Sequence, residues 1–434
     1  MAEQPRTQAP RIPGITVDDP HLMEGYEWAV SRSLAWVQTG KPDALPSYWA
    51  GLTDRPMFYA RDFVHQALAG HLLGLSAENA TMFDAFIDSA TPARRGYPLW
   101  SFFFDGAVPE LDYHADDDFV REVPIVFELI DRGLELFRWT GDERYRSAPE
   151  TMAYHRAAMT DFVELHDPLR NGVAGEFQSG DIFAGSATYN EGPRASGMRV
   201  AGDGIASQLS ALRALAAESA DSDFARWCVF ENDRIGRLFE GEWWDSDRGH
   251  YATGFSEDGA VTDFGYEPSW FPAVKAVMDP TRARSHLSWI DHEVVRTPPP
   301  NIEAFTYLPE AFFQYGEDVA GVRWLRHLID ARADYPEVPF IVVSTLLTGL
   351  PGIRPLPGGA LETRTHLPES TLEVTSVPFR DHLLDVRHDG SGATTLTVHG
   401  GDAPVTWVAW NDNRRTETTV APGEQVSVGT PLFP

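Results

Sequence analysis

An arginine and an aspartate stand side by side at the start of the apolar stretch MFYARDFVHQALAGHLLGL, residues 57–75. After Arg61 and Asp62, apolar residues recur at intervals of three and four, which is typical of a buried helix. Asp62 suits the N-terminus of this helix, because an acid there complements the helix dipole. Arg61 does not, since a cation at that end is unfavourable. The pair is therefore either a helix cap with a structural ion pair or part of a ligand-binding site.

Other residues that could bind a ligand or carry chemistry stand at or just before the starts of further predicted helices. Each has an ordinary explanation, because acids commonly cap helices, and tryptophan and histidine are often part of the core. Their shared position is harder to explain in that way. The candidate binding residues are Arg61, Asp62, His65, Trp100, Asp118, Arg121, Glu122, Asp203, Gln208, Trp244, Glu267, Trp270 and Tyr307, and the candidate catalytic residues are Glu176, Glu191 and Glu337.

This mixture of carboxylates, amides, arginines and indoles is typical of a carbohydrate site. Indole rings stack on the C–H faces of sugars, and Asp, Glu, Asn and Arg side chains hydrogen-bond to hydroxyls. Glycosidic cleavage needs two carboxyl groups, one protonated and one ionised, on either side of the anomeric carbon. The motifs of P-loop proteins, zinc peptidases and serine hydrolases (GxxxxGK[ST], HExxH and GxSxG) are absent from the sequence.

Composition excludes several kinds of partner. The chain has 35 basic and 64 acidic residues and a net charge of −29, so it repels nucleic acids and anionic membranes and suits a neutral partner. Its one cysteine, Cys228, allows neither an intrachain disulfide nor a thiolate metal cluster, and we expect no metal and no cofactor. The first residues lack the apolar segment of a secretory signal, and no run of about 18 apolar residues is present. These features predict a cytoplasmic protein.

Hydrophobic periodicity, read with helix start and stop signals, predicts twelve helices. Most odd-to-even connections are long and most even-to-odd ones are short, which predicts six helical hairpins in an α/α toroid. The even-numbered helices are apolar on more of their faces and should form the inner ring. Their N-termini then converge on one end, where we expect Arg61 and Asp62 to be exposed in a shared funnel. The predicted helices are 22–39, 57–75, 77–90, 117–139, 143–166, 203–218, 221–241, 267–278, 280–293, 303–316, 318–332 and 337–349.

The sequence pattern changes after Pro351. Short runs such as STLEVTSV and TTLTVHG alternate apolar and polar residues between Gly, Asp and Asn, which is typical of antiparallel strands. The tail is therefore predicted to form a small antiparallel β-sandwich. We expect a mainly α chain with an N-terminal extension at 1–20, a toroid at 21–355 and the sandwich at 356–434.

Arg61 and Asp62, at the mouth of the second of twelve predicted helices, resemble the Arg-Asp pair of glucoamylase-type enzymes. The resemblance covers the helical architecture of residues 20–350, and the tail is similar to the β-domains of rhamnosidase-like relatives. The chain thus resembles the six-hairpin glycoside hydrolases, the group that includes glucoamylases, trehalases and rhamnosidase-like enzymes. This resemblance implies that Arg61 and Asp62 bind hydroxyls of the sugar next to the scissile bond, and that the reaction inverts the anomeric configuration.

The same resemblance implies a general acid in the loop after the fifth helix and a general base between the eleventh and twelfth helices. The first loop offers Glu176, Asp181 and Glu191, and the second offers Asp334 and Glu337. The local sequences that the group has around these carboxylates are not reproduced in this chain. The choice among the candidates therefore stays open at this point.

We favour Glu191 as the acid and Glu337 as the base. A general acid must stay protonated near neutral pH, and Tyr189 and Asn190, which precede Glu191, can supply an apolar wall and a hydrogen bond. Glu337 enters the last inner helix from the loop in which the resemblance places the base. A glutamate in the first turn of a helix is also favourable for the helix dipole, which is the structural alternative for Glu337.

The sequence thus predicts a glycoside hydrolase that acts on the end of a neutral oligosaccharide or on a short glycoside, since long loops on one rim favour a pocket. A polysaccharide lyase or a sugar epimerase on the same fold is an alternative, because His65, His114 and Arg121 could serve proton abstraction from a uronate. A non-catalytic sugar-binding protein is a further alternative. The sequence carries no signal for an oligomeric state.

Overall fold

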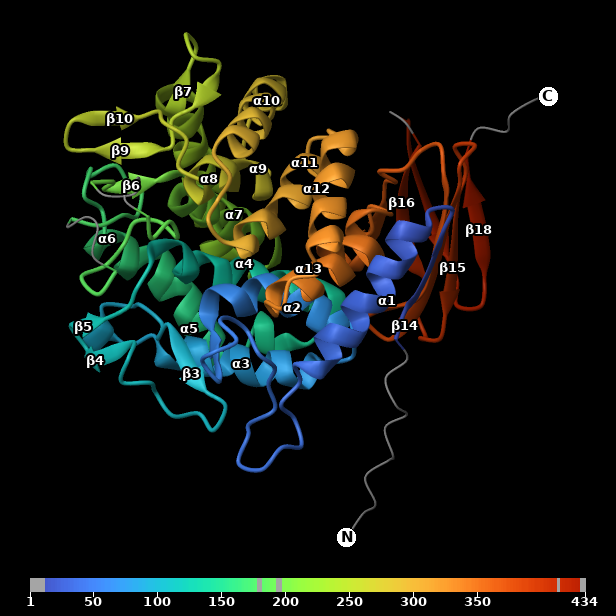
Figure 1. Ribbon diagram of the computed structural model, residues 1–434, viewed down its shortest axis with the longest axis horizontal. Helices are drawn as coiled ribbons and strands as arrows, with labels where there is room; N and C mark the ends of the chain where they lie inside the picture. Colours follow the sequence, from blue (N-terminus) through green and yellow to red (C-terminus); the bar gives the residue numbers. More distant parts are fainter. Residues whose placement is uncertain (1–11, 178–181, 193–196, 412–413, 430–434) are drawn as a thin grey trace.

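The computed structural model describes residues 12–177, 182–192, 197–411 and 414–429 of the chain (Figure 1). It consists of a helical region, followed by a C-terminal region of β-sheets on the right of Figure 1. One continuous apolar core extends through both regions. Within the described ranges, no helix combines the length and the hydropathy that crossing a bilayer would take. The architecture is that of a mainly helical chain with an appended β region, as predicted.

The helices alternate along the chain between an outer, amphipathic set and an inner set that is buried on most of its faces. Each predicted helical stretch overlaps one of them. The outer helices are α1 (Pro20–Ala35), α3 (Ser76–Ser89), α5 (Pro149–Ala157), α8 (Ser222–Leu238), α10 (Pro280–Arg296) and α12 (Asp318–Ala331). The inner helices are α2 (Ala60–Leu72), α4 (Val123–Thr140), α7 (Gly202–Glu218), α9 (Glu267–Val274), α11 (Leu308–Phe313) and α13 (Glu337–Ser344).

Several helices continue in tighter or wider turns. The 3-10 turn Ile302–Tyr307 leads into α11, because Pro309 stands in the first turn of that helix. The π-helical turn Ala158–Phe162 joins α5 to α6 (Val163–Leu165). Further π-helical turns extend α8 and α13, at Phe239–Trp243 and Thr345–Gly349.

The inner helices form a closed ring. Helix α2 packs against α4 and α13, α4 packs against α7, α7 against α9 and α9 against α11. The ring is completed where α11 contacts the π-helical turn after α13. Helices α7, α9 and α13 are buried along nearly their whole length, whereas the outer α8 and α12 bury only one face. This difference agrees with the predicted division into inner and outer helices.

Two inner helices begin later than predicted. Helix α2 begins at Ala60, because Met57–Tyr59 form strand β2 and pair with β3 (Ser101–Phe103). Helix α4 begins at Val123 rather than at 117, because Tyr113–Ala115 (β4) and Asp118–Phe119 (β5) form a hairpin. Other long loops also contain short strands. The strands β6 (Val200–Ala201), β9 (Gly254–Ser256) and β10 (Gly259–Val261) form one sheet, and β7 (Trp244–Asp245) pairs with β8 (His250–Tyr251).

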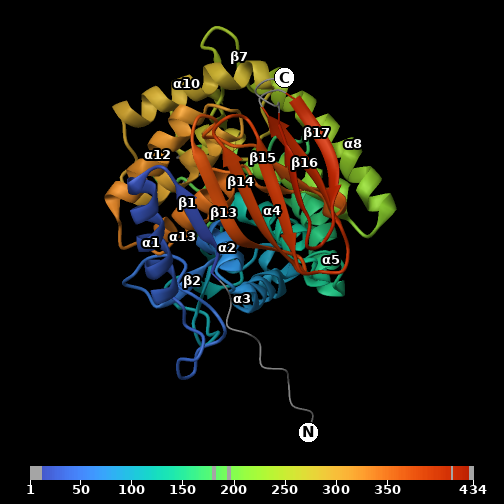
Figure 2. The same ribbon diagram turned by 90° about the vertical axis from the view of Figure 1, so that its right-hand side faces the viewer.

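The C-terminal region contains two sheets, which Figure 2 shows in front of the helices. The first has the order β1-β13-β14-β15-β18 and is antiparallel throughout. The second has the order β11-β12-β16-β17 and contains one parallel pair, β12 with β16. The strands are β1 (Gly14–Val17), β11 (Arg354–Pro355), β12 (Leu361–Thr363), β13 (Thr371–Phe379), β14 (His382–Asp389), β15 (Thr394–His399), β16 (Val405–Asn411), β17 (Arg414–Val420) and β18 (Gln425–Val428).

The β region covers the end of the helical ring where α2 and α4 terminate. The backbone N–H of Arg380, in the turn between β13 and β14, donates to the carbonyl of Trp139 at 2.6 Å. The rings of Phe379 and Trp139 pack edge to face with their centroids 6.0 Å apart. Strand β1 joins the same sheet, with Gly14 opposite Thr375. The long loops lie at the opposite end of the ring, where the inner helices begin.

Candidate active site

The inner helices carry ionisable side chains at or just before their first turns. Six segments supply them, and electrostatic interactions link the groups across the ring: Arg61 with Glu122, Asp62 with Glu337, and Glu267 with Asp203 and Glu303. The predicted convergence of the inner helix N-termini is therefore present. The groups are Arg61 and Asp62 (α2), Glu122 (before α4), Asp203 (α7), Glu267 (α9), Glu303 (before α11) and Glu337 (α13).

A cavity of about 510 Å³ lies at this end of the ring. Five of the predicted site residues line it: Arg61, Glu191, Glu267, Tyr307 and Glu337. Its remaining lining includes aromatic rings, amides and a proline wall, as a small neutral ligand with apolar faces and hydroxyls would require. These further residues are Tyr189, Asn190, Gly192, Tyr266, Pro298, Pro299, Pro300, Asn301, Glu303 and Ala304.

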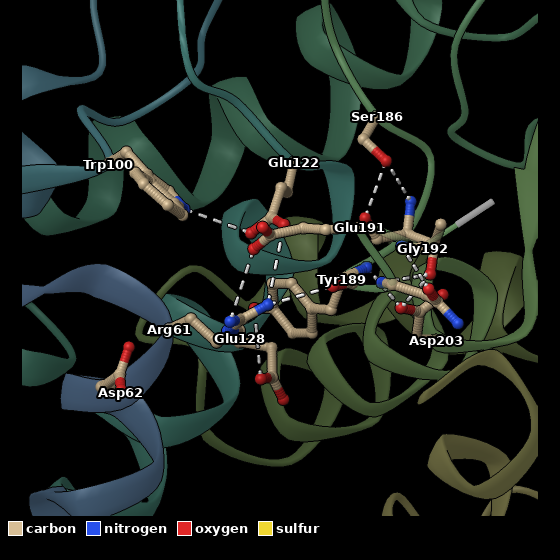
Figure 3. A network of polar contacts seen from close by, with 12 residues as sticks. Arg61, Asp62, Trp100, Glu122, Glu128, Ser186, Tyr189, Glu191, Gly192 and Asp203 are labelled. Atoms are coloured by element: carbon tan, nitrogen blue, oxygen red, sulfur yellow. Dashed lines mark hydrogen bonds and ion pairs between the residues drawn. The ribbon is translucent and has the colours of Figure 1, made fainter. Parts of the chain in front are cut away.

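Arg61 is held between two carboxylates (Figure 3). Its guanidinium lies 3.7 Å from Oε1 of Glu122 and 3.6 Å from Oε1 of Glu191. It donates to the carbonyl of Tyr189 at 3.0 Å and lies 5.4 Å above the ring of the same residue. Trp100 supports Glu122 by donating its indole N–H to Oε2 at 3.3 Å. The surrounding negative charge explains why a cation is tolerated at the N-terminus of α2.

Asp62 is buried, contrary to the expectation that it would be exposed beside Arg61. Its exposed fraction is 4%, and its Oδ1 accepts a hydrogen bond from the hydroxyl of Tyr335 at 2.8 Å. Burial, with a smaller contribution from the charge of Glu337, raises the pKa of Asp62 to about 7. Asp62 thus acts on the site through its interaction with Glu337 and is not part of the cavity lining.

Glu337 is the most deeply placed carboxyl group of the cavity. Its Oε1 contacts Nδ1 of His65 in a short hydrogen bond, and the hydroxyl of Thr306 lies 2.9 Å from the same oxygen. Burial first, and the negative charge of Glu303 second, raise the pKa of Glu337 to about 8. Burial lowers the pKa of His65 to about 3, so the histidine is neutral.

The other carboxyl groups at the helix N-termini also hold their protons unusually well. Burial is the largest cause for each, and it raises the pKa of Glu122 to about 8, of Asp203 to about 7 and of Glu267 to about 8. Helix N-termini and Arg61 act in the opposite direction, because both favour ionised carboxylates. The balance leaves several carboxyl groups able to donate or accept a proton near neutral pH, which is the condition for acid–base catalysis.

The loop that carries Glu191 is fixed at several points (Figure 3). Oδ2 of Asp203 accepts the backbone N–H of Tyr189 at 2.7 Å and the hydroxyl of Thr188 at 2.8 Å. Asn190 donates to the carbonyl of Gly265 and accepts the N–H of Gly192 at 2.7 Å. The Glu191 side chain itself is 45% exposed and faces Arg61. Asp203 therefore anchors the loop, while Glu191 remains open to the cavity.

Two further predicted site residues, Glu176 and Gln208 of α7, do not line the cavity. Glu176 is buried, accepts a short hydrogen bond from the Tyr97 hydroxyl and faces His166. Gln208 accepts the N–H of Ala174 at 3.0 Å and so supports the backbone of a neighbouring loop. Asp181, the remaining acid candidate of this loop, lies outside the described residues.

The other predicted residues outside the cavity are placed as follows. Arg121 donates to the carbonyl of Ala184 at 2.9 Å. Asp118 is exposed on β5. Trp244 is half-buried beneath the guanidinium of Arg282, and Trp270 is fully buried behind the cavity, where it contacts the ring of Tyr266.

Some residues of the cavity lining could not be recognised as site residues from the sequence. Tyr266 has a φ of 62°, a conformation that few residues other than glycine adopt, and it immediately precedes Glu267. The run TPPPN before the Ile302–Tyr307 turn was the one signal for a rigid wall. Among the described residues, no group of three or more His, Cys, Asp or Glu side chains is placed to hold a metal ion.

The comparisons with known proteins agree with this architecture. No family model and no curated protein matches the sequence. The solved structures that it resembles include the GH78-family rhamnosidase of Bacillus sp. GL1 (TM-score 0.62, 14% identity) and a rhamnosidase from Klebsiella oxytoca with rhamnose bound (TM-score 0.59, 14% identity). They also include a kojibiose phosphorylase, described as putative, from the human microbiome (TM-score 0.59, 8% identity).

The matched regions are long on this chain. The match to the Bacillus rhamnosidase covers 91% of this chain and 42% of the solved chain. The match to the Klebsiella rhamnosidase covers 79% and 67%, and the match to the phosphorylase covers 97% and 68%, in the same order. The chain therefore spans less than half the length of the Bacillus rhamnosidase. At these low identities the likeness concerns the fold alone. This chain has the α/α-toroid fold of the glycoside-hydrolase-like group, as its similarity to these solved structures shows.

Proposed function

We propose that this chain is an inverting glycoside hydrolase that removes a neutral sugar from the end of an oligosaccharide or from a short glycoside. The observation that carries the proposal is the single cavity in which Glu191, Glu267 and Glu337 converge around Arg61. Its volume of about 510 Å³ suits one or two sugar rings, which favours exo action. The fold shared with rhamnosidases supports a glycoside as the substrate.

In this proposal, Glu337 is the general base and Glu191 is the general acid. Ionised Glu337 takes a proton from a water molecule, whose oxygen forms a bond to the anomeric carbon. The bond from that carbon to the leaving oxygen breaks, and Glu191 gives its proton to that oxygen. The products are an alcohol and a sugar of inverted configuration. Arg61, positioned by Glu122 and the Tyr189 carbonyl, hydrogen-bonds to sugar hydroxyls.

Glu267 is the alternative acid in the same cavity. Its raised pKa, about 8, meets the requirement that a general acid be protonated near neutral pH. Glu191 is preferred because it is the partly exposed carboxyl group, within reach of a leaving group that points toward solvent. A glycosyl fluoride, whose leaving group needs no proton, separates the contributions of Glu191 and Glu267.

We further infer that the helices form six hairpins around this cavity. The strict alternation of outer and inner helices along the chain supports this arrangement, as does the packing of α2 on α3, α7 on α8 and α11 on α12. The sixth pair is formed by the last inner helix and the first outer helix, because α13 packs against α1.

A test begins with a panel of neutral glycosides, rhamnosides and glucosides of both anomers among them, incubated with the wild-type chain and with Glu337→Gln. We expect sugar release from at least one substrate by the wild-type chain only. Proton NMR of the first-formed product should give an anomer opposite to that of the substrate. Release of the same anomer as the substrate would contradict inversion, and no release from any glycoside would contradict hydrolysis.

Phosphorolysis is the second candidate, because the chain also has the fold of a phosphorylase. A phosphorylase uses phosphate in place of water and must bind that anion beside the anomeric carbon. Among the described residues that line the cavity, Arg61 is the one cation, and Glu122 and Glu191 already surround it. The acidic cavity therefore favours water over phosphate. A sugar phosphate formed only in the presence of inorganic phosphate would reverse this preference.

A further inference from the structure

His65 separates the proposed active site from a second cavity. It lies on α2, four residues after Arg61, and is 6% exposed. Its ring is stacked on that of Tyr307, with centroids 4.0 Å apart and planes at 3°. Tyr307 and Glu337 line the substrate cavity, whereas His65 and Thr306 line the second one. The two cavities therefore meet at this group of four residues.

The second cavity has a volume of about 160 Å³ and lies between the inner helices and the β region. Its lining mixes apolar side chains with many polar ones, and these polar groups can hold water. Hydroxyls of α13 and its π-helical turn contribute, and so do charged groups of both regions. The polar lining is Arg132, Glu135, Thr306, Glu310, Gln314, Ser344, Thr345, Thr348, Arg354, Arg364 and His366.

The two nitrogens of His65 have different surroundings. Nδ1 is hydrogen-bonded to Oε1 of Glu337, and the Thr306 hydroxyl lies 3.5 Å from it. Nε2 makes no hydrogen bond to any residue within the described ranges, although the ring lines the second cavity. A neutral imidazole carries one N–H, and the nitrogen that accepts determines which one donates.

We propose that His65 is the positioning residue for the general base, with its Nδ1–H fixed on Oε1 of Glu337 by a water molecule in the second cavity that donates to Nε2. The other oxygen of Glu337 is then left to take the proton of the attacking water. Because the donor favours the ionised carboxylate, it counteracts the burial that holds Glu337 protonated. The inference rests on the proposed function in assigning Glu337 as the base.

The charged groups around His65 and Glu337 also affect the ionisation of Glu337. The charge of Glu303 opposes ionisation of Glu337, whereas the charge of Arg61 and the side-chain hydrogen bonds of Thr306 and Asp62 favour it. The ionisable groups that interact with the pair are Arg61 and Asp62 of α2, Glu128 and Arg132 of α4, Lys275 after α9, Glu303 and Tyr307 of the 3-10 turn and Glu310 of α11.

Three substitutions at His65 separate positioning from packing. In His65→Asn, the side-chain amide reaches the place of Nδ1 and can still donate to Glu337. In His65→Gln the amide reaches the place of Nε2, and in His65→Leu there is no donor. His71→Asn is the matched control, because His71 is also buried on α2, but is bonded to Ser76 and near the Pro378 carbonyl.

The pH profile of kcat/KM and the titration of Glu337 are the two measurements. We expect His65→Gln and His65→Leu to move the acidic limb upward by about one pH unit or more and to lower kcat about tenfold or more, with KM nearly unchanged. His65→Asn should retain most of the wild-type profile, and His71→Asn should leave it unmoved.

Carbon-13 NMR of the glutamate carboxyl groups, assigned by the signal lost in Glu337→Gln, gives the Glu337 pKa without any substrate. The same order of variants is expected in this titration. An unshifted Glu337 titration in both His65→Gln and His65→Leu would overturn the inference even if the enzyme hydrolyses glycosides. A shifted titration in a chain that releases no sugar would instead retain the His65–Glu337 pairing and reject the proposed function.

Discussion

The Arg61 guanidinium lies 3.6 Å from Oε1 of Glu191, although Arg61 is in the first turn of α2 and Glu191 is in the loop before α7. Only the fold brings them together, because Asp203 fixes the loop that carries Glu191 and α2 presents Arg61 at its N-terminus. A cation and a carboxylate meet here in a cavity dominated by acids.

Arg61→Lys should lower kcat/KM about 100-fold, which corresponds to about 2.7 kcal/mol of transition-state stabilisation. A lysine cannot contact Glu122, Glu191 and the Tyr189 carbonyl at once, since it lacks the planar fork of the guanidinium. Steady-state kinetics on the best glycoside of the panel is the measurement. Arg213→Lys is the control, because Arg213 donates to the carbonyls of Lys275 and Ala276 outside the cavity. Equal kinetics for wild type and Arg61→Lys would remove Arg61 from the site.

Glu191→Gln and Glu337→Gln should each lower kcat on an alkyl glycoside about 100- to 10,000-fold. They should differ on a glycosyl fluoride, whose leaving group needs no proton. The acid variant should then recover much of its rate and the base variant should not. If Glu267→Gln shows this recovery and Glu191→Gln does not, the acid is Glu267.

Glu176→Gln is the matched control for these substitutions. Glu176 is a buried glutamate of the same long loop, but it is bonded to Tyr97 and does not line the cavity. We expect a lower melting temperature and less than a tenfold change in kcat. A loss as large as that of Glu191→Gln would return Glu176 to the candidates for the acid.

Asp62→Asn should abolish most of the activity while the melting temperature changes by only a few degrees. The buried carboxyl of Asp62 accepts the Tyr335 hydroxyl and interacts with Glu337, so an amide there alters the charge behind the base. Tyr335→Phe removes only the hydroxyl and should cost less in kcat than Asp62→Asn. A large loss of stability with retained activity would show that Asp62 is only a helix cap.

Glu267→Gln should stabilise the folded chain at pH 8 more than at pH 4.5. Burial raises the pKa of Glu267 to about 8 in the folded state, whereas its ordinary pKa is 4.5. Between these pH values the folded chain keeps a proton that the unfolded chain has released. The contribution to stability is therefore full at acidic pH and is lost as the pH rises to about 8. Gln resembles the protonated acid, and we expect a gain of about 1–2 kcal/mol at pH 8.

Chemical denaturation of wild type and Glu267→Gln at the two pH values measures this difference. Glu417→Gln is the control, because the Glu417 side chain is half exposed on the β region. Equal effects of Glu267→Gln at both pH values would contradict a raised pKa.

Neutral glycosides should be hydrolysed about tenfold faster, or more, than the corresponding uronates. The carboxylate of a uronate would approach Glu303, Glu337 and Glu267, and like charges at such distances repel. Competition between a glucoside and the matching glucuronide, followed by the release of each sugar, is a direct measurement. Faster release of the uronate would favour the lyase or epimerase alternatives of the sequence analysis.

The helical ring and the convergence of its N-termini could be predicted from the sequence, because hydrophobic periodicity and connection lengths are local signals. Thus the stretch that starts near Glu267 is recognisable as an inner helix from its composition alone. The loop structure could not be predicted in the same way. Asp118 seemed to open a helix but pairs within a hairpin, since strand pairing in a long loop depends on contacts distant in sequence.

The burial of individual side chains was the main property of the site that could not be predicted from the sequence. Asp62 and Trp270 have residue types and positions suited to a sugar site, yet both are turned into the protein interior. Conversely, the wall formed by Pro298–Pro300 and Tyr266 became recognisable only when the loops were placed around Arg61. The direction of a side chain at the end of a helix depends on its neighbours in space, and periodicity gives no account of them.

Strand β1 has a consequence for how the molecule unfolds. Residues Gly14–Val17 add an edge strand to β13, and the helix that follows at once, α1, packs against α13. The first outer helix and the last inner helix thus meet at a seam, and the polypeptide on one side of that seam is hydrogen-bonded to the C-terminal sheet. The seam cannot separate unless β1 leaves the sheet. Opening of the ring and loss of the sheet edge should therefore be one cooperative event, with common amide-exchange rates in α1, α13 and β13.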